Sequence, residues 1–271
     1  MAVIPGRKGG VYIGDETIED TSDAWTADNA STAATDADIP TGTSGTSVKI
    51  VVPDIGANLL LAHEVISLNI SDRDVVRLWV KCSISLTAGQ VQLILDDTAT
   101  GLSPLKLMDI PALSSGTWTR ILLDMGDASG LTAVLAVGVK QVADLGAYNL
   151  FVKDIQAVSI VDGIKSWNLT AGVETLDSTD FQDGQATNSG RTFISGLSNW
   201  SGSFEGYKDA VPLELSFSST VAIALAASQT AGQAWIGDAY ITNITPTAPV
   251  DGIVTYSYDF QGTGLLEVAS V

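Results

Sequence analysis

Short apolar runs bounded by turn-forming residues recur along this chain and constrain its fold most. Many positions in these runs are β-branched, several runs alternate apolar and polar residues, and clusters of Gly, Asp, Ser and Thr separate them. Such a pattern is typical of strands joined by turns. The clearest runs cover residues 73–86, 91–97, 119–125, 132–140 and 150–160. We therefore expect a mainly all-β chain of the sandwich, barrel or jelly-roll type, with at most one short helix.

Residues 218–229 are the one segment whose class stays open. Their sequence, SSTVAIALAASQ, combines alanines with valine and isoleucine. Alanine favours a helix, whereas the β-branched residues favour a strand. The sequence therefore permits either structure for this segment.

The net charge of the chain limits the classes of partner that it can bind. Of 271 residues, 31 are acidic and 13 basic, which gives a formal charge of −18. Proteins that read nucleic acids draw affinity from Lys and Arg on the phosphates, so this excess argues against that class. No apolar stretch reaches the roughly 20 residues of a membrane helix. Pro5 and Gly6 interrupt the place of a secretory leader, so we expect synthesis in a cytoplasm and no membrane partner.

Residue types needed for common catalytic sites are scarce. Cys82 is the only cysteine and His63 the only histidine, and His63 lies in the apolar run LLLAHEVISL. A cysteine zinc cluster is excluded, and His63 fits a structural role better than a catalytic triad. Phosphate-binding glycine loops are missing. Two carboxylates suffice for a glycosidase, but no pair stands out among the acidic residues. We expect neither an enzyme nor a cofactor.

Three blocks in the second half of the chain carry a family resemblance. They are IKSWNLTAGVETLDSTDFQDG (164–184), RTFISGLSNWSGSFEGYKDAVPLEL (191–215) and WIGDAYITNITPTAPVDGIVTYSYDFQGTG (235–264). In this order and spacing they resemble the major tail tube protein of long-tailed, non-contractile (siphovirus-type) phages. The segment GGVYIGDETI (9–18) is similar to the first strand of that family.

The resemblance implies an inserted domain, because in the family this first strand leads directly to the strand matched by residues 164–169. We therefore expect a discontinuous tail tube domain over 1–19 and 162–271. Residues 20–161 would form an inserted jelly roll, similar to carbohydrate-binding modules and on the outside of the tube. The insert holds 16 acidic and 8 basic residues, and the flanks hold 15 and 5.

The family's function is a further expectation. The chain would form stacked, hexameric rings in the virion tail, whose acidic lumen conducts DNA during ejection without binding it specifically. Its partners would be other copies of itself and tail proteins such as the tape measure and tail terminator. Candidate lumen or inter-ring residues are Glu174, Asp177, Asp180 and Asp183. An ordinary solvated loop explains these four carboxylates equally well.

The insert allows several interpretations. Trp25, Trp79 and Trp118 could stack on host-surface glycans, although core packing suits Trp79 and Trp118 better. A structural calcium could take oxygen ligands from an aspartate set, for which turn residues are the commoner explanation. That set is Asp72, Asp74 and Asp154. The alternative functions for the whole chain are a capsid decoration protein and a glycan-binding module.

Overall fold

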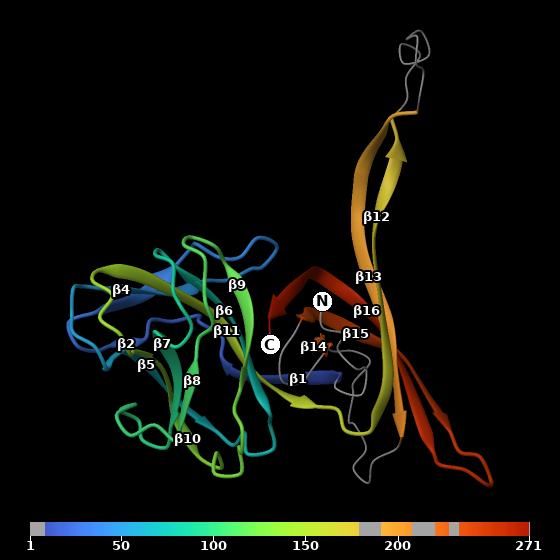
Figure 1. Cartoon of the computed structure of the whole chain (residues 1–271), viewed down its shortest axis with the longest axis horizontal. Coiled ribbons are helices and arrows are strands. Elements are labelled where there is room, and N and C mark those ends of the chain that lie inside the picture. The colour runs from blue at the N-terminus through green and yellow to red at the C-terminus, as the bar shows by residue number, and fades with distance from the viewer. Residues whose placement is uncertain (1–8, 179–190, 208–219, 228–232, 271) are drawn as a thin grey trace. The chain divides into compact units, whose positions relative to one another are not determined.

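The computed structural model describes residues 9–178, 191–207, 220–227 and 233–270, and these residues form strands and no helix. The expectation of an all-β sandwich is confirmed (Figure 1). The strands up to the end of the predicted insert are β1 (Gly10–Glu19), β2 (Thr26–Ala27), β3 (Thr32–Asp36), β4 (Ser47–Val52), β5 (Leu59–Leu68), β6 (Val75–Cys82), β7 (Val91–Asp96), β8 (Lys106–Asp109), β9 (Thr119–Asp124), β10 (Val134–Gln141) and β11 (Tyr148–Ile160). They are followed by β12 (Ile164–Asp177), β13 (Phe193–Tyr207), β14 (Val221–Ala226), β15 (Gln233–Thr247) and β16 (Thr255–Ser270).

Contacts divide the chain into two compact units. The sandwich unit comprises Met1–Asp162, Val221–Gly237 and Glu267–Val271. The ribbon unit comprises Gly163–Thr220 and Asp238–Leu266. A boundary therefore falls close to the predicted end of the insert at residue 161, whereas β1 belongs with residues 20–161. The expected organisation as a domain inserted into a discontinuous one stays a prediction.

Two antiparallel sheets enclose the core of the sandwich unit. One contains β3, β4, β11, β6 and β9, and the other has the order β2-β5-β10-β7-β8. Alternate residues of both sheets are apolar and meet in one buried cluster, as expected for strands with one face inward. This cluster includes Val48, Ile50, Leu78, Val80, Ile121 and Val152 from the first sheet and Leu61, Leu93, Leu95, Val137 and Val139 from the second.

Strand β11 changes its neighbour along one edge. Its first half pairs with β4 up to Val152, and its second half pairs with β1 from Ile155 onward. Asp154 lies between them with a φ of 49°, which interrupts the regular strand. The Lys153 side chain is 2% exposed, and its Nζ donates to the Thr46 carbonyl at 3.1 Å and to Asp154 Oδ1 at 3.0 Å. A buried ammonium thus satisfies oxygens where the regular ladder stops.

Within residues 218–229, for which the sequence allowed either a helix or a strand, residues 221–226 form strand β14. It pairs with β1 from Gly10↔Ala226 to Gly14↔Ala222, and its residues are buried on both faces. The small alanines allow a close approach to the large side chains of Tyr12 and Leu122 in one apolar cluster. Burial and pairing therefore outweigh the helix propensity of alanine.

Four aromatic side chains on adjacent strands form the buried centre of the ribbon unit. The Phe204 and Tyr258 rings stack with centroids 4.9 Å apart, and Phe260 lies 6.3 Å from Phe204 and 6.0 Å from Trp200. Phe204 and Tyr258 are directly opposite in the β13–β16 ladder. Such cross-strand aromatic pairs stabilise a sheet.

Replacing Lys153 tests the junction in β11. Lys153→Met removes a charge-assisted hydrogen bond from a buried ammonium to the partly buried Thr46 carbonyl and should lower the free energy of unfolding by about 2 kcal/mol. Urea denaturation followed by circular dichroism measures this change. Lys165→Met is the control, because Lys165 is 59% exposed and 3.9 Å from Glu205. Equal stability of the two variants would contradict the role assigned to Lys153.

The carboxyl group of Glu19 predicts a pH dependence. Burial raises its pKa above the usual value, and nearby Asp20, Asp23 and Glu64 raise the pKa further, against a hydrogen bond from the Thr21 N–H. A carboxyl whose pKa is raised on folding favours the folded state below its unfolded pKa, and this contribution is lost as the pH rises through the folded pKa. Glu19→Gln should therefore be more stable than the parent at pH 7 and equal to it near pH 4. Urea midpoints at the two pH values test this, and a variant less stable at pH 7 would refute it.

Candidate functional site

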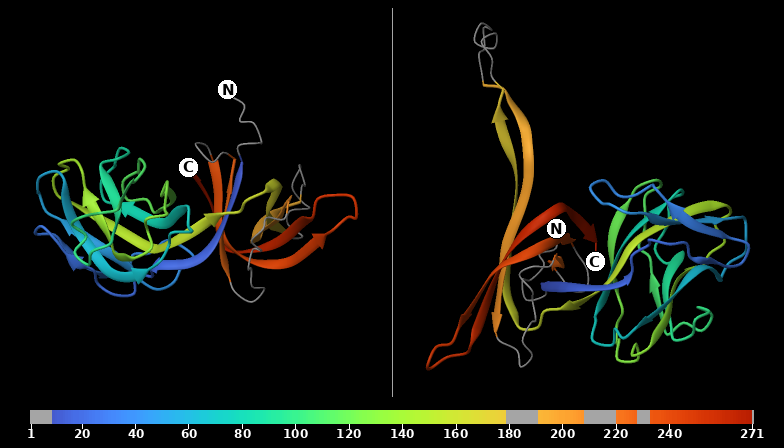
Figure 2. Two further views of the ribbon diagram at one scale, coloured as in Figure 1. Left: turned by 90° about the horizontal axis from the view of Figure 1, so that it is seen from below. Right: turned by 180° about the vertical axis from the view of Figure 1, so that it is seen from behind.

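The outer half of the β12–β13 pair is a two-stranded ribbon without a further neighbour among the described strands (Figure 2, right). The β12–β13 ladder extends to Asp177↔Phe193, whereas β16 pairs with β13 only from Ser201 to Tyr207. An isolated two-stranded ribbon is at best marginally stable in water. The ribbon is therefore a candidate for contact with another molecule.

Large apolar side chains are exposed on this ribbon. Leu176 and Ile194 are opposite each other in the ladder and are 50% and 56% exposed. Phe193 and Val173, whose alternation places them on the other face, are both 54% exposed. Apolar groups on both faces of a ribbon are typical of a surface that another chain covers.

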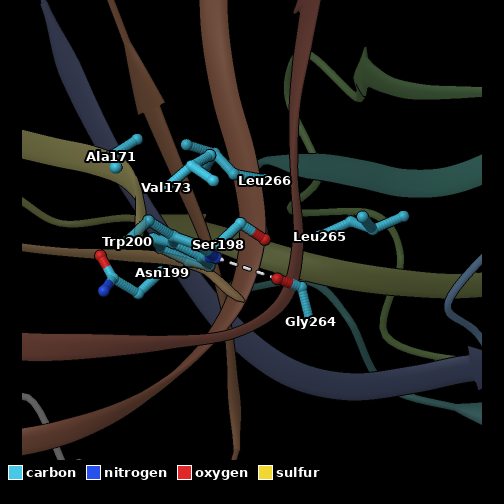
Figure 3. Close-up of a pocket in the computed structure, with 9 residues that line it drawn as sticks. Ala171, Val173, Ser198, Asn199, Trp200, Gly264, Leu265 and Leu266 are labelled. Carbon is cyan, nitrogen blue, oxygen red and sulfur yellow. Dashed lines mark hydrogen bonds between the residues drawn. The ribbon is translucent and has the colours of Figure 1, made fainter. Parts of the chain in front are cut away.

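A pocket of about 390 Å³ lies at the base of the ribbon (Figure 3). Its walls come from β12, β13 and β16 and include Ala171, Val173, Trp200, Leu265 and Leu266. Trp200 is 4% exposed and donates from Nε1 to the Gly264 carbonyl at 3.2 Å, so its indole forms a fixed wall. Gly264 has a φ of 68°, a conformation that favours glycine. The pocket is lined by uncharged residues whose apolar and polar atoms contribute in nearly equal measure, and its Trp200, Val173 and Leu266 side chains offer apolar contacts.

Glycine is required where Trp200 packs on β16. A Cβ at Gly262 would lie 2.0 Å from the Trp200 ring, so the indole rests directly on the backbone. Gly202 is similarly close to Phe260. Gly202 and Gly262 therefore allow aromatic rings to pack closely on neighbouring strands.

The predicted carboxylates are only partly brought together. Glu174 and Asp177 both lie on the exposed outer part of β12, but strand alternation places them on opposite faces of the ribbon. Asp177 Oδ2 is 3.8 Å from the Nη1 atom of Arg191, whose side chain is 76% exposed. Asp180 and Asp183 lie outside the described residues. The assignment of these four carboxylates to a lumen or an inter-ring contact stays a prediction.

The three tryptophans of the predicted insert occupy different environments. Trp25 and Trp79 are each 3% exposed, so neither presents a ring for stacking on a sugar. Arg120 lies 4.5 Å from the Trp79 ring. Trp118 is half-buried, donates to Asp38 Oδ1 at 3.0 Å and contacts Phe151 edge-on. Of the three, Trp118 alone retains a partly accessible indole.

The other candidate residues have structural partners. His63 is buried, and its Nδ1 is 2.7 Å from Asp28 Oδ2. Asp74 Oδ2 accepts a hydrogen bond from the Ile160 N–H, and Asp154 pairs with Lys153. Among the described residues, no group of three or more His, Cys, Asp or Glu side chains is arranged to hold a metal ion.

The sequence reasoning missed the exposed apolar residues and the Trp200 pocket. The available signal was the pair of segments VETLD and FISGL, in which apolar residues occupy both strand faces. That pattern is equally expected of a strand buried on both sides. Only the arrangement of neighbouring strands distinguishes the two cases.

Comparisons with known proteins add no assignment: no family model and no curated protein matches this chain. Within the described part of the chain, no helix is long and apolar enough to cross a membrane.

Two glycine substitutions test the packing of Trp200. Gly262→Ala places a methyl group inside the indole contact and should lower the free energy of unfolding by about 2 kcal/mol through overpacking. Gly172→Ala is a matched control on the other strand beside β13, because its Cβ would only reach ordinary contact with Asn199 at 3.7 Å. Urea denaturation followed by tryptophan fluorescence measures both. If the two variants were equally stable, the close contact at Gly262 would be refuted.

Proposed function

We propose that this chain is a major tail tube subunit of a long-tailed, non-contractile phage and assembles into stacked, hexameric rings. The three motif blocks and the first-strand segment, in family order, support this assignment. The outer β12–β13 ribbon, which has no further neighbour among the described strands, is the observation that best supports a role in assembly. It exposes apolar groups on both faces, and an isolated pair of strands is only marginally stable in water.

Contact between copies of the chain is the simplest way to bury the exposed apolar side chains of the ribbon. Complete burial of a fully exposed leucine or isoleucine side chain contributes about 1.5–3 kcal/mol. Leu176 and Ile194 are about half exposed, so roughly half of that remains to be gained in an interface. Several such residues per subunit, repeated around a ring, provide a large stabilisation without any catalytic group. Heterologous contacts whose rotation closes generate rings.

The negative charge of the chain supports the proposal that the tube conducts DNA. In the proposed tube, carboxylates line a lumen through which DNA passes, and repulsion between carboxylates and phosphates keeps the DNA from adhering. The predicted insert, residues 20–161, decorates the exterior, because the lumen has no room for one such domain from every subunit. The tape measure and the tail terminator are the expected tail partners, and host-surface glycans are the candidate ligand of the insert.

Electron microscopy of the concentrated full chain tests the proposal. Negative staining should show rings or tubes. Protein that stays monomeric at high concentration and is not found in purified tails would refute a tube function and favour the alternatives, a capsid decoration protein or a glycan-binding module.

A charged substitution on the ribbon tests its part in assembly. Ile194→Asp introduces a carboxylate into the proposed contact and should prevent tube formation at concentrations at which the parent assembles. Val65→Asp is the matched control, since Val65 is 54% exposed in the sandwich unit. Circular dichroism checks that both variants fold. If Ile194→Asp formed normal tubes, the ribbon would not be part of the assembly contact.

A further inference from the structure

We propose that the β15–β16 turn of one copy inserts into the Trp200 pocket of a second copy. The turn is defined by residues 248–254 and the pocket by the walls described above, around Trp200, Val173 and Leu266. This inference rests on the proposed self-assembly and names two surfaces that would meet.

The turn presents apolar side chains that the described residues of its own copy leave largely exposed. Val250 is 100% exposed and Ile253 is 66% exposed. Both lie in the connection between β15, which ends at Thr247, and β16, which begins at Thr255. This connection is the end of the long hairpin drawn in red (Figure 1). A fully solvated valine at the tip of a hairpin gains by burial in an apolar site.

The pocket matches such a tip in size and chemistry. Its volume of about 390 Å³ can hold the side chains of Val250 and Ile253 together. Exposed Val173 and Leu265 lie at its edge, and the fixed Trp200 indole forms a wall. An aliphatic side chain seated there would contact the ring without displacing a charged group.

The turn cannot fill the pocket of its own copy. Both surfaces involve β16, but the turn precedes Thr255 whereas the pocket contains Gly264–Leu266. At about 3.3 Å per residue, these parts of one strand are about 30 Å apart. A turn seated in this pocket therefore comes from another copy of the chain.

Charge favours a second copy of this chain as that occupant. Two copies with a formal charge of −18 each repel one another, so they meet most readily through uncharged surfaces. None of the residues that line the pocket is charged, and Asp251 is the only charged residue of the turn. A cationic partner would gain no ion pair in this pocket.

The symmetry of the contact fits assembly. The turn and the pocket are different surfaces of one chain, so their contact is heterologous and leaves a free turn and a free pocket at the two ends of any pair. Repetition of the contact builds a ring or an open stack.

Cross-linking tests the contact directly. We expect the double variant Val250→Cys/Val173→Cys, treated as assembled full chain with a short bismaleimide, to give dimers and higher multimers on a denaturing gel. Each single variant and the control pair Val65→Cys/Val173→Cys should stay largely monomeric. Native Cys82 is buried and present in all of them.

The outcomes separate this inference from the proposed function. Tubes without a 250–173 cross-link would overturn the turn-in-pocket contact and leave the tube function standing. A chain that never self-associates would overturn both. A cross-link formed within one chain would also overturn the contact, because the two residues would then be close in a single copy.

A charged turn provides a second measurement. Val250→Asp should raise the concentration needed for assembly about tenfold, the equivalent of one buried valine side chain. Light scattering measures this concentration, and Val65→Asp should leave it unchanged. An unchanged concentration for Val250→Asp would overturn the contact even if tubes form.

Discussion

The pairing of β11 is the constraint on which the sandwich unit depends. This strand hydrogen-bonds to β6 along one edge and successively to β4 and β1 along the other. Where one neighbour replaces the other, two threonines at the end of β1 and the start of β4 exchange hydrogen bonds, from Thr46 to the Thr21 carbonyl and from Thr21 to the Thr46 carbonyl. The buried Lys153 ammonium completes the junction. Without it, a backbone oxygen would be buried beside an irregular strand with one partner fewer.

The ribbon unit, in contrast to the sandwich unit, has a small buried centre and a large exposed apolar part. Its aromatic centre is small. The Trp200 and Phe260 rings lie against Gly262 and Gly202, and Phe260 packs against both Trp200 and Phe204. Beyond this centre, β12 and β13 continue as a pair with exposed apolar residues. A surface of this kind is costly for a monomer and useful for a subunit, because the same groups stabilise contacts between copies. The surface proposed for assembly therefore lies in the ribbon unit.

Much of the fold could be predicted from local sequence. The apolar runs at 73–86, 91–97, 119–125, 132–140 and 150–160 overlap β6, β7, β9, β10 and β11. Residues 221–226 could not be assigned, because alanine and the β-branched residues have opposite preferences and pairing with β1 decides between them. Core packing was correctly favoured for Trp79, whereas Trp118 is only half-buried and its indole hydrogen-bonds to Asp38.

The sequence by itself determined the all-β class, the acidic character and the motifs on which the tail tube proposal rests. These follow from residue type and spacing, which act locally or sum over the chain. Only the tertiary structure decided which apolar residues are covered. Val173, Leu176 and Ile194 have the residue types of a buried strand, yet they are exposed because no described strand beyond the β12–β13 pair itself lies beside this part of the ribbon. Burial depends on neighbours distant in sequence, and the alternation within one strand carries no information about them.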